Sequence, residues 1–523
     1  MIDYLIIGSG PAGTAAAYAL RNSGCVVMDP GISGEHTSPL DGDLFELRRS
    51  RADLFDELIG SRFEALHNIH NPPMSLKLKA PGLRFITRGQ EALSPVEPGK
   101  FEATMSFAQG GLANAWGAGA YRFNEADLAS FPIGTADLAP WYDEVTELIG
   151  VAGTDDDLSR WFGHTEGKLL PPVRLSSYFA GMLLAYQKRR TFMNSHGVHL
   201  GRSRLAVLTQ PYRERPPYAY HNLDFFRPLN RAVYNPAFTL NELTSANLIR
   251  YERGLLALSW KEHESHIELT AKRLDSGGIE TLMARHLIVA AGALNTARLA
   301  LASAIDTTTR LPIMDNPMSC IPLVRLSRIG AGRDPLDSPL GQLNMVYEGP
   351  DSTETLQATL YGTAGPMRSD LAMQFPLSLR ANLACARYLT PAIGFVLLFY
   401  PDAPDAGNYL QLLDSGALRI VHRQAHRGQV ERGLIRAFRK LGYLSSFRLC
   451  QFPSIGAGIH YAGCLPMKAD PGPYETRPDG SLYGFRRVYV VDGAVFPRLP
   501  AKNLTLTIMA NAMRVASQLR ARP

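Results

Sequence analysis

Two residues near the end of the chain have side chains suited to handling the proton of a hydroxyl group. His460 lies in the segment SIGAGIHYAGCLPM, residues 454–467, which has no charged residue before Lys468. Imidazole has an ordinary pKa near 6.5, so it can accept a proton at neutral pH. Asn503 follows 43 positions later. Its amide cannot act as a base, but it can orient a hydroxyl and stabilise developing negative charge.

Each of these residues also has a purely structural interpretation. A lone histidine among glycines is more often a packed, hydrogen-bonded side chain. Asparagine is a favoured N-cap, and the apolar spacing of Leu506, Met509 and Met513 predicts a helix directly after Asn503. The catalytic interpretation of the pair becomes the stronger one only in combination with the start of the chain.

The first thirty residues predict a dinucleotide-binding site. A short apolar strand at 4–7 is followed by a GxGxxG pattern, an Ala-rich helix to about Asn22, and a second strand at 25–28 that ends at Asp29. The three glycines are Gly8, Gly10 and Gly13. They allow a tight turn, close backbone approach to a pyrophosphate, and packing of the helix on the sheet, in that order. The helix N-terminus attracts the phosphates, and an acid at this distance accepts hydrogen bonds from ribose.

The type of dinucleotide follows from the number and place of the fingerprints. Glycine pairs at Gly330 and Gly456 lack the rest of the pattern, so one fingerprint indicates one dinucleotide. Its position at the N-terminus of a long chain favours tightly bound FAD over NAD, by analogy with other flavoproteins.

A second glycine cluster, GGLANAWGAG at 110–119, surrounds Trp116. So much glycine beside a large ring predicts backbone that approaches a flat ligand closely. A glycine-rich surface loop is the alternative.

The composition indicates a globular protein too large for one ordinary core. The chain has 523 residues, of which 46% are apolar and 20% charged, and a net charge of +6. Its basic residues are scattered, which favours a solvated surface over nucleic-acid binding. Five cysteines without a CxxC pattern predict neither a disulfide framework nor a metal site. No secretory signal is visible, and the longest apolar run, 391–400, is about half a bilayer span. We therefore expect a cytoplasmic protein without an integral membrane segment.

Other segments should position these residues. Apolar or alternating runs predict strands at 248–251, 267–270, 285–292, 320–326, 394–400 and 409–413. Helices are expected from about Asn295 and near 429–441. Residues 209–229 are rich in proline and aromatic residues and predict an irregular connection or lid that lines a cavity.

The end of the chain carries a family resemblance. The segment RVYVVDGAVFPRLPAKNLTLTIMANAMRVASQL at 487–519, with GSGPAG at the start and GIHYAGCLPM before it, resembles the glucose–methanol–choline (GMC) oxidoreductases. These are FAD-dependent alcohol oxidases and dehydrogenases. QGGLANAWGAG is similar to the family's flavin-contacting GGSSNxWGG segment, with Leu112 and Ala113 in place of its serines. LIVAAGALNTARLAL is similar to its second flavin strand. His460 and Asn503 fall on its catalytic pair.

The resemblance implies an α/β fold of two domains. One is a Rossmann-like FAD-binding domain of discontinuous segments, and the other is an α+β substrate-binding domain with a mainly antiparallel sheet. We expect the FAD-binding domain at 1–35, 85–130, 230–312 and 454–523. The substrate-binding domain and lid are expected at 36–84, 131–229 and 313–453.

The resemblance also implies the reaction and the site. A CH–OH group of a sugar, glycoside, polyol or aromatic or secondary alcohol would be oxidised to an aldehyde or ketone by hydride transfer to flavin N5. His460 would be the general base and Asn503 its partner. The expected cofactor contacts are Gly8, Gly10, Pro11, Ala12, Gly13, Asp29, Gly110, Gly111, Asn114, Trp116, Gly117, Leu255, Ala291, Gly292, Asp492, Gly493, Asn503, Leu504 and Thr505.

The binding mode and the electron acceptor complete these expectations. Residues 106–115 contain no His, Cys or Tyr that could anchor a flavin, so FAD is expected to be non-covalent. The acceptor is oxygen, a quinone or a redox protein. Two alternatives stay open: a flavin-containing lyase of the hydroxynitrile-lyase type on the same fold, and a non-catalytic flavoprotein.

Overall fold

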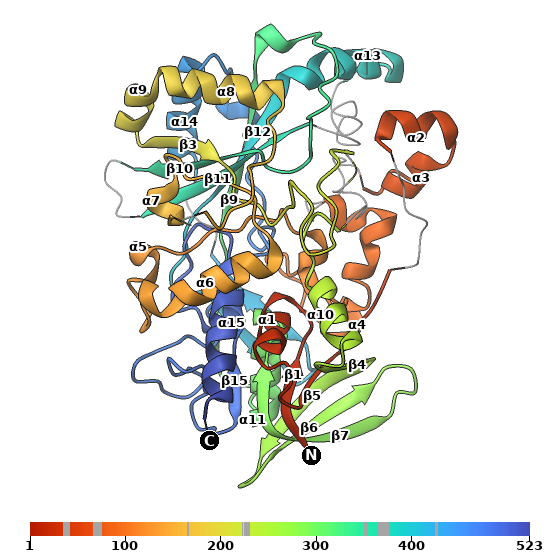
Figure 1. Cartoon of the computed structure of the whole chain (residues 1–523), viewed down its shortest axis with the longest axis vertical. Helices are drawn as coiled ribbons and strands as arrows, with labels where there is room; N and C mark the ends of the chain where they lie inside the picture. The colour runs from red at the N-terminus through yellow and green to blue at the C-terminus, as the bar shows by residue number, and fades with distance from the viewer. Residues whose placement is uncertain are drawn as a thin grey trace.

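Two sheets of different type lie one above the other in Figure 1. The structure is a computed structural model of the chain. It describes residues 1–34, 42–65, 76–164, 167–221, 223, 231–349, 354–363, 376–423 and 427–522. Both ends of the chain lie beside the lower sheet in this view.

The lower sheet is of the Rossmann type. Its strand order is β4-β2-β1-β7-β6-β5, and β15 also pairs with β7. The strands are β1 (Ile2–Ile7), β2 (Cys25–Asp29), β4 (Arg250–Arg253), β5 (Leu255–Glu262), β6 (Ile267–Arg273), β7 (Ile279–Val289) and β15 (Val488–Val490). The pairs that involve β1, β2, β4 and β15 are parallel, whereas β6 runs antiparallel to both of its neighbours, β5 and β7. Apolar residues of β1, β2 and β7 are buried because helices cover this part of the sheet.

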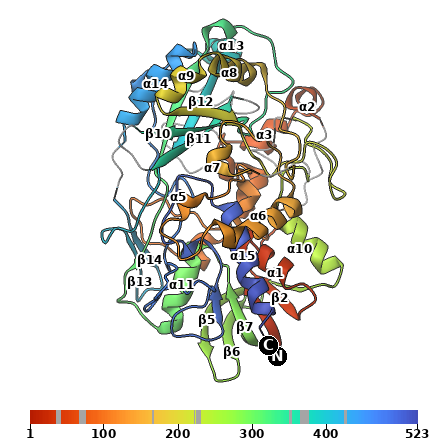
Figure 2. The same ribbon diagram turned by 60° about the vertical axis from the view of Figure 1, so that its left-hand side comes forward.

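Helices from opposite ends of the chain pack together on this sheet. Helix α1 (Pro11–Ala19) contacts α15 (Thr505–Arg520), and the two lie side by side in Figures 1 and 2. Their contact brings the glycine turn after β1 close to the segment that precedes α15.

The upper sheet is antiparallel, with the order β3-β10-β11-β12-β9. The strands are β3 (Val198–Arg202), β9 (Met318–Val324), β10 (Leu343–Glu348), β11 (Thr355–Gly362) and β12 (Ile393–Phe399). Alternate residues such as Met345, Ala358 and Leu398 are buried in one core with helices α8 (Ser177–Lys188) and α14 (Gln429–Lys440). The residues between them therefore face the other way, toward the Rossmann-type sheet.

The remaining elements connect or extend these two sheets. A small sheet has the order β14-β13-β8, with β8 (Leu311–Pro312), β13 (Tyr409–Leu412) and β14 (Leu418–Val421). The other described α-helices are α2 (Leu44–Ser50), α3 (Leu54–Ile59), α4 (Gln90–Leu93), α5 (Glu125–Leu128), α6 (Thr135–Ile149), α7 (Ser159–Phe162), α9 (Arg190–Ser195), α10 (Pro236–Ser245), α11 (Ala293–Ala304) and α13 (Leu379–Leu389).

This architecture confirms the predicted fold class, with two local corrections. Helix α1 ends at Ala19, and Asn22 has a left-handed backbone with a φ of 65°. The N-cap of α15 is Leu504 and not Asn503, and no side chain caps this helix. The interpretation of Asn503 as an N-cap was therefore wrong. The proposed domain boundaries stay a prediction.

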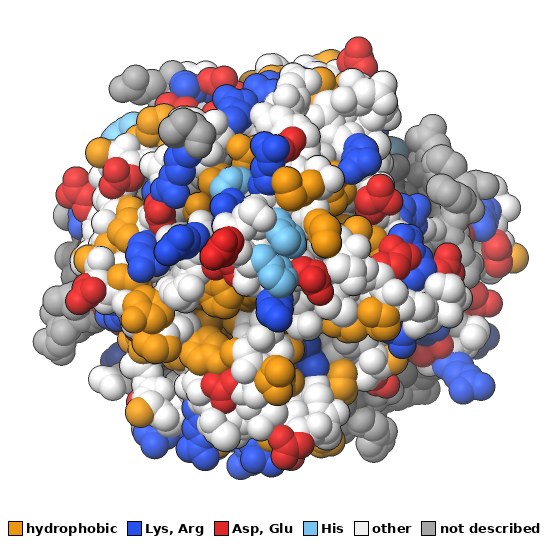
Figure 3. All heavy atoms as spheres, turned by 90° about the horizontal axis from the view of Figure 1, so that it is seen from below, with side chains coloured by type: hydrophobic (Ala, Val, Ile, Leu, Met, Phe, Trp, Pro, Cys, Tyr) orange, Lys and Arg blue, Asp and Glu red, His pale blue; other side chains and the backbone are white. Residues whose placement is uncertain are grey.

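The surface and the described helices bear on the expected partners. On the face seen in Figure 3, Lys and Arg side chains are interspersed with Asp and Glu side chains and do not form one basic patch. Within the described part of the chain, no helix is long and apolar enough to cross a bilayer, and no cluster of metal-ligating side chains occurs. The expected cytoplasmic location and the expected lack of a nucleic-acid partner stay predictions.

Candidate active site

A cavity of about 660 Å³ extends from the glycine turn after β1 to the inner face of the antiparallel sheet. This volume falls within the range of about 300–1,000 Å³ that is typical of ligand sites. The cavity begins at the carboxyl ends of parallel strands, where doubly wound sheets bind their ligands.

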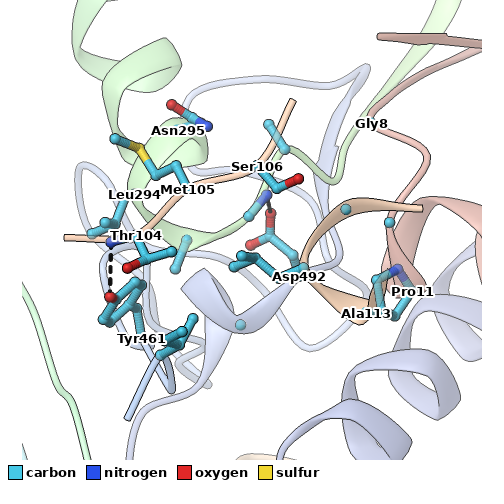
Figure 4. A pocket seen from close by; sticks show the side chains of 18 of the residues that line it. Gly8, Pro11, Thr104, Met105, Ser106, Ala113, Leu294, Asn295, Tyr461 and Asp492 are labelled. Carbon is cyan, nitrogen blue, oxygen red and sulfur yellow. Dashed lines mark hydrogen bonds between the residues drawn. The ribbon is translucent and has the colours of Figure 1, made fainter. Parts of the chain in front are cut away.

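Most of the predicted cofactor contacts line this cavity. They are Gly8, Gly10, Pro11, Ala12, Asp29, Gly111, Trp116, Gly117, Leu255, Ala291, Gly292, Asp492, Gly493, Asn503, Leu504 and Thr505. Three of the predicted contacts do not line the cavity but lie next to residues that do: Gly13, Gly110 and Asn114. Figure 4 shows Gly8, Pro11 and Asp492 around this end of the cavity.

The three fingerprint glycines have different steric reasons to be glycine. Gly8 has a φ of +102°, and a Cβ there would lie 2.4 Å from the carbonyl oxygen of Ala290. A Cβ on Gly13 would lie 1.9 Å from the carbonyl oxygen of Gly8, so this residue sets the approach of α1 to the sheet. A Cβ on Gly10 would have no neighbour within 4 Å. Gly10 therefore leaves room for a ligand and not for another part of the protein.

Asp29 is the last residue of β2, and hydrogen bonds from the glycine turn after β1 and from β4 hold its carboxylate. Its Oδ2 accepts hydrogen bonds from the backbone N–H of Ser9, at 2.9 Å, and from the Ser9 hydroxyl. Its Oδ1 accepts one from the Tyr251 hydroxyl at 2.7 Å. Burial raises the pKa of Asp29, and these hydrogen bonds oppose that rise. Ser9 Oγ also accepts from the N–H of Gly110 at 3.1 Å, which joins the two glycine-rich segments.

Asn114 shapes the second glycine-rich loop. Its Nδ2 donates to the carbonyl oxygens of Gln109 and Gly111 at 2.9 and 2.7 Å, and its Oδ1 accepts from Asn235 at 2.7 Å. Asn114 therefore holds the loop in shape and does not line the cavity, and its direct contact with the cofactor stays a prediction. The indole N–H of Trp116 donates to the Tyr234 carbonyl at 2.9 Å, and its ring lines the cavity.

Asp492 joins the turn after β7 to the C-terminal segment. Its Oδ2 accepts from the N–H of Gly292 at 2.8 Å and from the hydroxyl of Thr296 at 2.5 Å. Its Oδ1 accepts from the N–H of Ala494 at 2.9 Å. Burial raises the pKa of Asp492, and the hydrogen bonds oppose that rise. The sequence marks Asp492 as a cofactor contact, and its three hydrogen bonds show that it also fixes the local backbone.

His460 and Asn503 meet at the other end of the cavity. The His460 Nε2 lies 3.4 Å from the Asn503 Nδ2, and Nδ1 lies 3.0 Å from the Oδ1 of Asn316. The imidazole stacks on the ring of Phe399, with centroids 5.1 Å apart. Burial lowers the pKa of His460 to about 4. The ring is therefore neutral at pH 7 and able to accept a proton, although its pKa is lower than the ordinary value on which the sequence argument rests.

Hydrogen bonds of the Tyr461 hydroxyl to the backbone hold the loop that carries His460. The hydroxyl of the next residue, Tyr461, accepts from the N–H of Thr104 at 3.0 Å, as Figure 4 shows, and lies 2.8 Å from the carbonyl oxygens of Glu102 and Gly456. The loop therefore lies against the segment 104–107, which also lines the cavity.

A buried ion pair anchors the segment that carries Asn503. Lys502 Nζ pairs with the carboxylate of Asp127 and donates to the Trp161 carbonyl at 2.7 Å. Burial lowers the pKa of Lys502, and the charge of Asp127 opposes this. Gly119 leaves the space that the amide needs, because a Cβ there would lie 2.7 Å from Asn503 Oδ1.

The antiparallel sheet supplies the wall opposite the glycine turn. Alternate residues of three neighbouring strands line the cavity: Met318, Thr359, Tyr361, Leu397 and Phe399. The buried Asn344 supports this wall by donating to the hydroxyls of Tyr121 and Thr359 at 2.9 and 3.2 Å. Sequence reasoning placed these strands and Asn316 in the substrate-binding domain but singled out none of their residues. The alternating pattern of the strands was the available signal, but it does not say which face meets a ligand.

The predicted lid is not part of this wall as far as it is described. None of the residues 209–221 or 223 lines the cavity, so the prediction was wrong for them. Residues 222 and 224–230 lie outside the described residues.

Comparisons with known proteins find a family model, a sequence relative and a structural neighbour. A family model described as GMC oxidoreductase matches residues 444–512, which include both His460 and Asn503. A C-glycoside 3-oxidase from Microbacterium trichothecenolyticum is 24% identical over 553 aligned positions, which cover 99% of this chain and 96% of the relative. The crystal structure of pyridoxine 4-oxidase from Mesorbium loti has a TM-score of 0.59 over the full length of both chains at 13% identity. The last likeness shows the fold.

Proposed function

We propose that this chain is a member of the glucose–methanol–choline (GMC) oxidoreductases and, like them, an FAD-dependent oxidoreductase that converts a CH–OH group to an aldehyde or ketone. One observation carries the proposal. A single cavity has the dinucleotide fingerprint at one end and the His460–Asn503 pair at the other.

The residues around the first end of the cavity fit FAD. The N-terminus of α1 and the open space at Gly10 suit a pyrophosphate, and the carboxylate of Asp29 suits a ribose. The turn at Gly292, held by Asp492, and the segment 503–505 would complete the contacts. When bound, FAD supplies the acceptor for the hydride. Its attachment would be non-covalent, since the lining residues between 106 and 115 offer no His, Cys or Tyr.

His460 would accept the proton of the substrate hydroxyl. A hydride leaves carbon readily only when the hydroxyl proton also leaves, so a base beside the oxygen accelerates the reaction. The neutral imidazole is available for this above its lowered pKa of about 4. The Asn503 Nδ2, close to His460 Nε2, would donate a hydrogen bond to the same oxygen as negative charge develops on it. Stacking on Phe399 would hold the imidazole in place.

We propose a ring-bearing alcohol as the substrate, such as a sugar, a glycoside or an aromatic alcohol. The aromatic side chains of Trp116, Tyr361 and Phe399 line the cavity and can pack against a ring. The names of the two relatives support this, since one is an oxidase of C-glycosides and the other of pyridoxine.

Loss of flavin colour without oxygen tests the proposal. The purified protein with bound FAD would be mixed anaerobically with D-glucose, a C-aryl glucoside, pyridoxine, glycerol and benzyl alcohol. We expect at least one of them to bleach the visible flavin absorption, and air admitted afterwards would show whether oxygen restores it. Turnover of a substrate while the flavin stays oxidised would contradict the proposal and favour a lyase. No bleaching and no turnover by any of them would favour a non-catalytic flavoprotein.

A further inference from the structure

We infer that Asn316 is a positioning residue that selects the tautomer of His460 and so makes Nε2 the basic atom. The inference rests on the proposed function only for the role of Nε2 as the base that accepts the substrate proton. The tautomer itself is a property of the protein that can be observed without a substrate.

The orientation of the Asn316 amide is fixed by the backbone around it. Its Nδ2 donates to the carbonyl oxygens of Tyr400 and Pro500, at 2.7 and 3.1 Å. These two acceptors come from different segments, and the side chain is fully buried between them. A flipped amide would place its oxygen against two carbonyl oxygens. The atom that faces His460 is therefore the Oδ1.

This orientation determines which nitrogen of His460 carries the proton. Asn316 Oδ1 can only accept a hydrogen bond, so the imidazole Nδ1 at 3.0 Å must be the donor. A neutral imidazole has one N–H, which leaves the lone pair on Nε2. The Nδ2 of Asn503, a donor, lies 3.4 Å from Nε2 on the other side of the ring. Two amides thus favour the same tautomer.

The selected tautomer is the one that base catalysis needs. With the proton on Nδ1, the lone pair of Nε2 points toward Asn503, where the proposed function places the substrate oxygen. With the proton on Nε2, the ring would present a donor there and could not accept the hydroxyl proton. Asn316 does not line the cavity, so any effect it has on the reaction is transmitted through His460.

The residue before Asn316 holds the backbone of the same loop. Asp315 Oδ2 accepts from the N–H of Gly456 at 2.7 Å, and its own N–H donates to Asp402 Oδ2 at 3.0 Å. Asp402 Oδ2 also lies 2.8 Å from His422 Nε2. Two adjacent residues therefore have distinct tasks: Asp315 holds the loop and Asn316 holds the ring.

The titratable groups packed around Asn316 and His460 are Asp315, Asp402, His422, Tyr400 and Tyr461. Burial raises the pKa of Asp315 to about 7. Burial lowers the pKa of His422, but the hydrogen bond and charge of Asp402 outweigh this and raise it. The partner of the His460 Nδ1 is a neutral amide, which stabilises the imidazolium less than a carboxylate would.

Nitrogen NMR of the histidines observes the tautomer directly. Protein with bound FAD would be labelled with ¹⁵N-histidine, and His460→Gln would identify the His460 signals. We expect a protonated Nδ1 and an unprotonated Nε2 in the wild type, and loss of this preference in Asn316→Leu. A wild-type ring protonated at Nε2, or an unchanged tautomer in Asn316→Leu, would overturn the inference. Because no substrate is used, this result stands even if no alcohol bleaches the flavin and the proposed function fails.

The rate of anaerobic bleaching, measured with whichever of the five alcohols is active, tests the consequence. Asn316→Leu should bind FAD normally but bleach about 10- to 100-fold more slowly, the size of effect that follows loss of a group orienting a metal-binding histidine. Asn408→Leu is a matched control. It removes another buried amide, which contacts His422 and not His460, and should leave the rate within about twofold. A rate in Asn316→Leu equal to that of the control would overturn the inference.

Asn316→Ala keeps the test decisive if Asn316→Leu does not fold. Alanine also removes the Oδ1 acceptor, but it brings neither bulk nor charge against the carbonyl oxygens of Tyr400 and Pro500. The preference for a protonated Nδ1 should be lost, as expected for Asn316→Leu. A His460 ring that keeps the wild-type tautomer in Asn316→Ala would show that residue 316 does not select it.

Discussion

Two of the three fingerprint glycines, Gly10 and Gly13, should have different effects when each is replaced by alanine. The methyl group of Gly10→Ala would have no protein atom within 4 Å, and the φ of Gly10 is −70°, which alanine adopts without strain. The folded protein without FAD should therefore be as stable as the wild type or up to about 1 kcal/mol more stable, because alanine restricts the unfolded chain. Its methyl group, however, would occupy the space proposed for the pyrophosphate.

The methyl group of Gly13→Ala would instead lie 1.9 Å from the carbonyl oxygen of Gly8. Helix α1 would have to move away from the sheet, and it could not do so without disturbing its contact with α15. Overpacking of this kind costs about 1–3 kcal/mol. The loss should be visible in the protein without FAD, before any ligand is considered.

Urea unfolding of both variants without FAD, followed by fluorescence titration with FAD, separates the two effects. Gly10→Ala should unfold at the wild-type urea concentration but bind FAD about 10- to 100-fold more weakly, as loss of one or more phosphate hydrogen bonds would cause. Gly13→Ala should unfold earlier. Equal FAD affinity in Gly10→Ala and the wild type would refute the placement of the pyrophosphate at this turn.

Three further predictions concern buried charges. The bleaching rate should be constant above about pH 5 and fall about tenfold per pH unit below about 4. The reason is that burial lowers the pKa of His460 to about 4 and the base works only while it is neutral. A fall in rate that begins near pH 6.5 would contradict this. Lys502→Met should lower the free energy of unfolding by about 3–5 kcal/mol, since it leaves Asp127 buried without its counter-ion, and urea unfolding of Lys502→Met/Asp127→Asn should recover much of the loss. Asp492→Asn should lower both the melting temperature and the FAD content of the purified protein, because an amide cannot accept all three hydrogen bonds; unchanged FAD content would show that this turn does not contact the cofactor.

The parts of the fold that depend on local patterns could be predicted from the sequence. The turn at Gly8 and the strands around it follow from glycine sterics and from apolar runs that are buried on both faces, and these need no knowledge of distant residues. The approximate extents of β12 and α14 follow from their apolar periodicity in the same way.

The parts of the site that depend on distant residues could not be predicted. Asn316 is 144 positions from His460, and Tyr251 is 222 positions from Asp29, so no spacing rule connects them. Asn503 has the right residue type for an N-cap, but its contact with His460 takes the amide away from the helix end. The lowered pKa of His460 is also a tertiary effect, because it comes from burial beneath segments far apart in the sequence.

The central claim is that His460 removes the hydroxyl proton while hydride leaves the same alcohol. Its most direct test is the anaerobic bleaching rate of His460→Ala, compared with the wild type at equal FAD content and with a saturating alcohol from the panel. Loss of a general base predicts a rate about 10²- to 10⁴-fold lower, with the FAD still bound. A variant that keeps its FAD and bleaches at the wild-type rate would contradict the account.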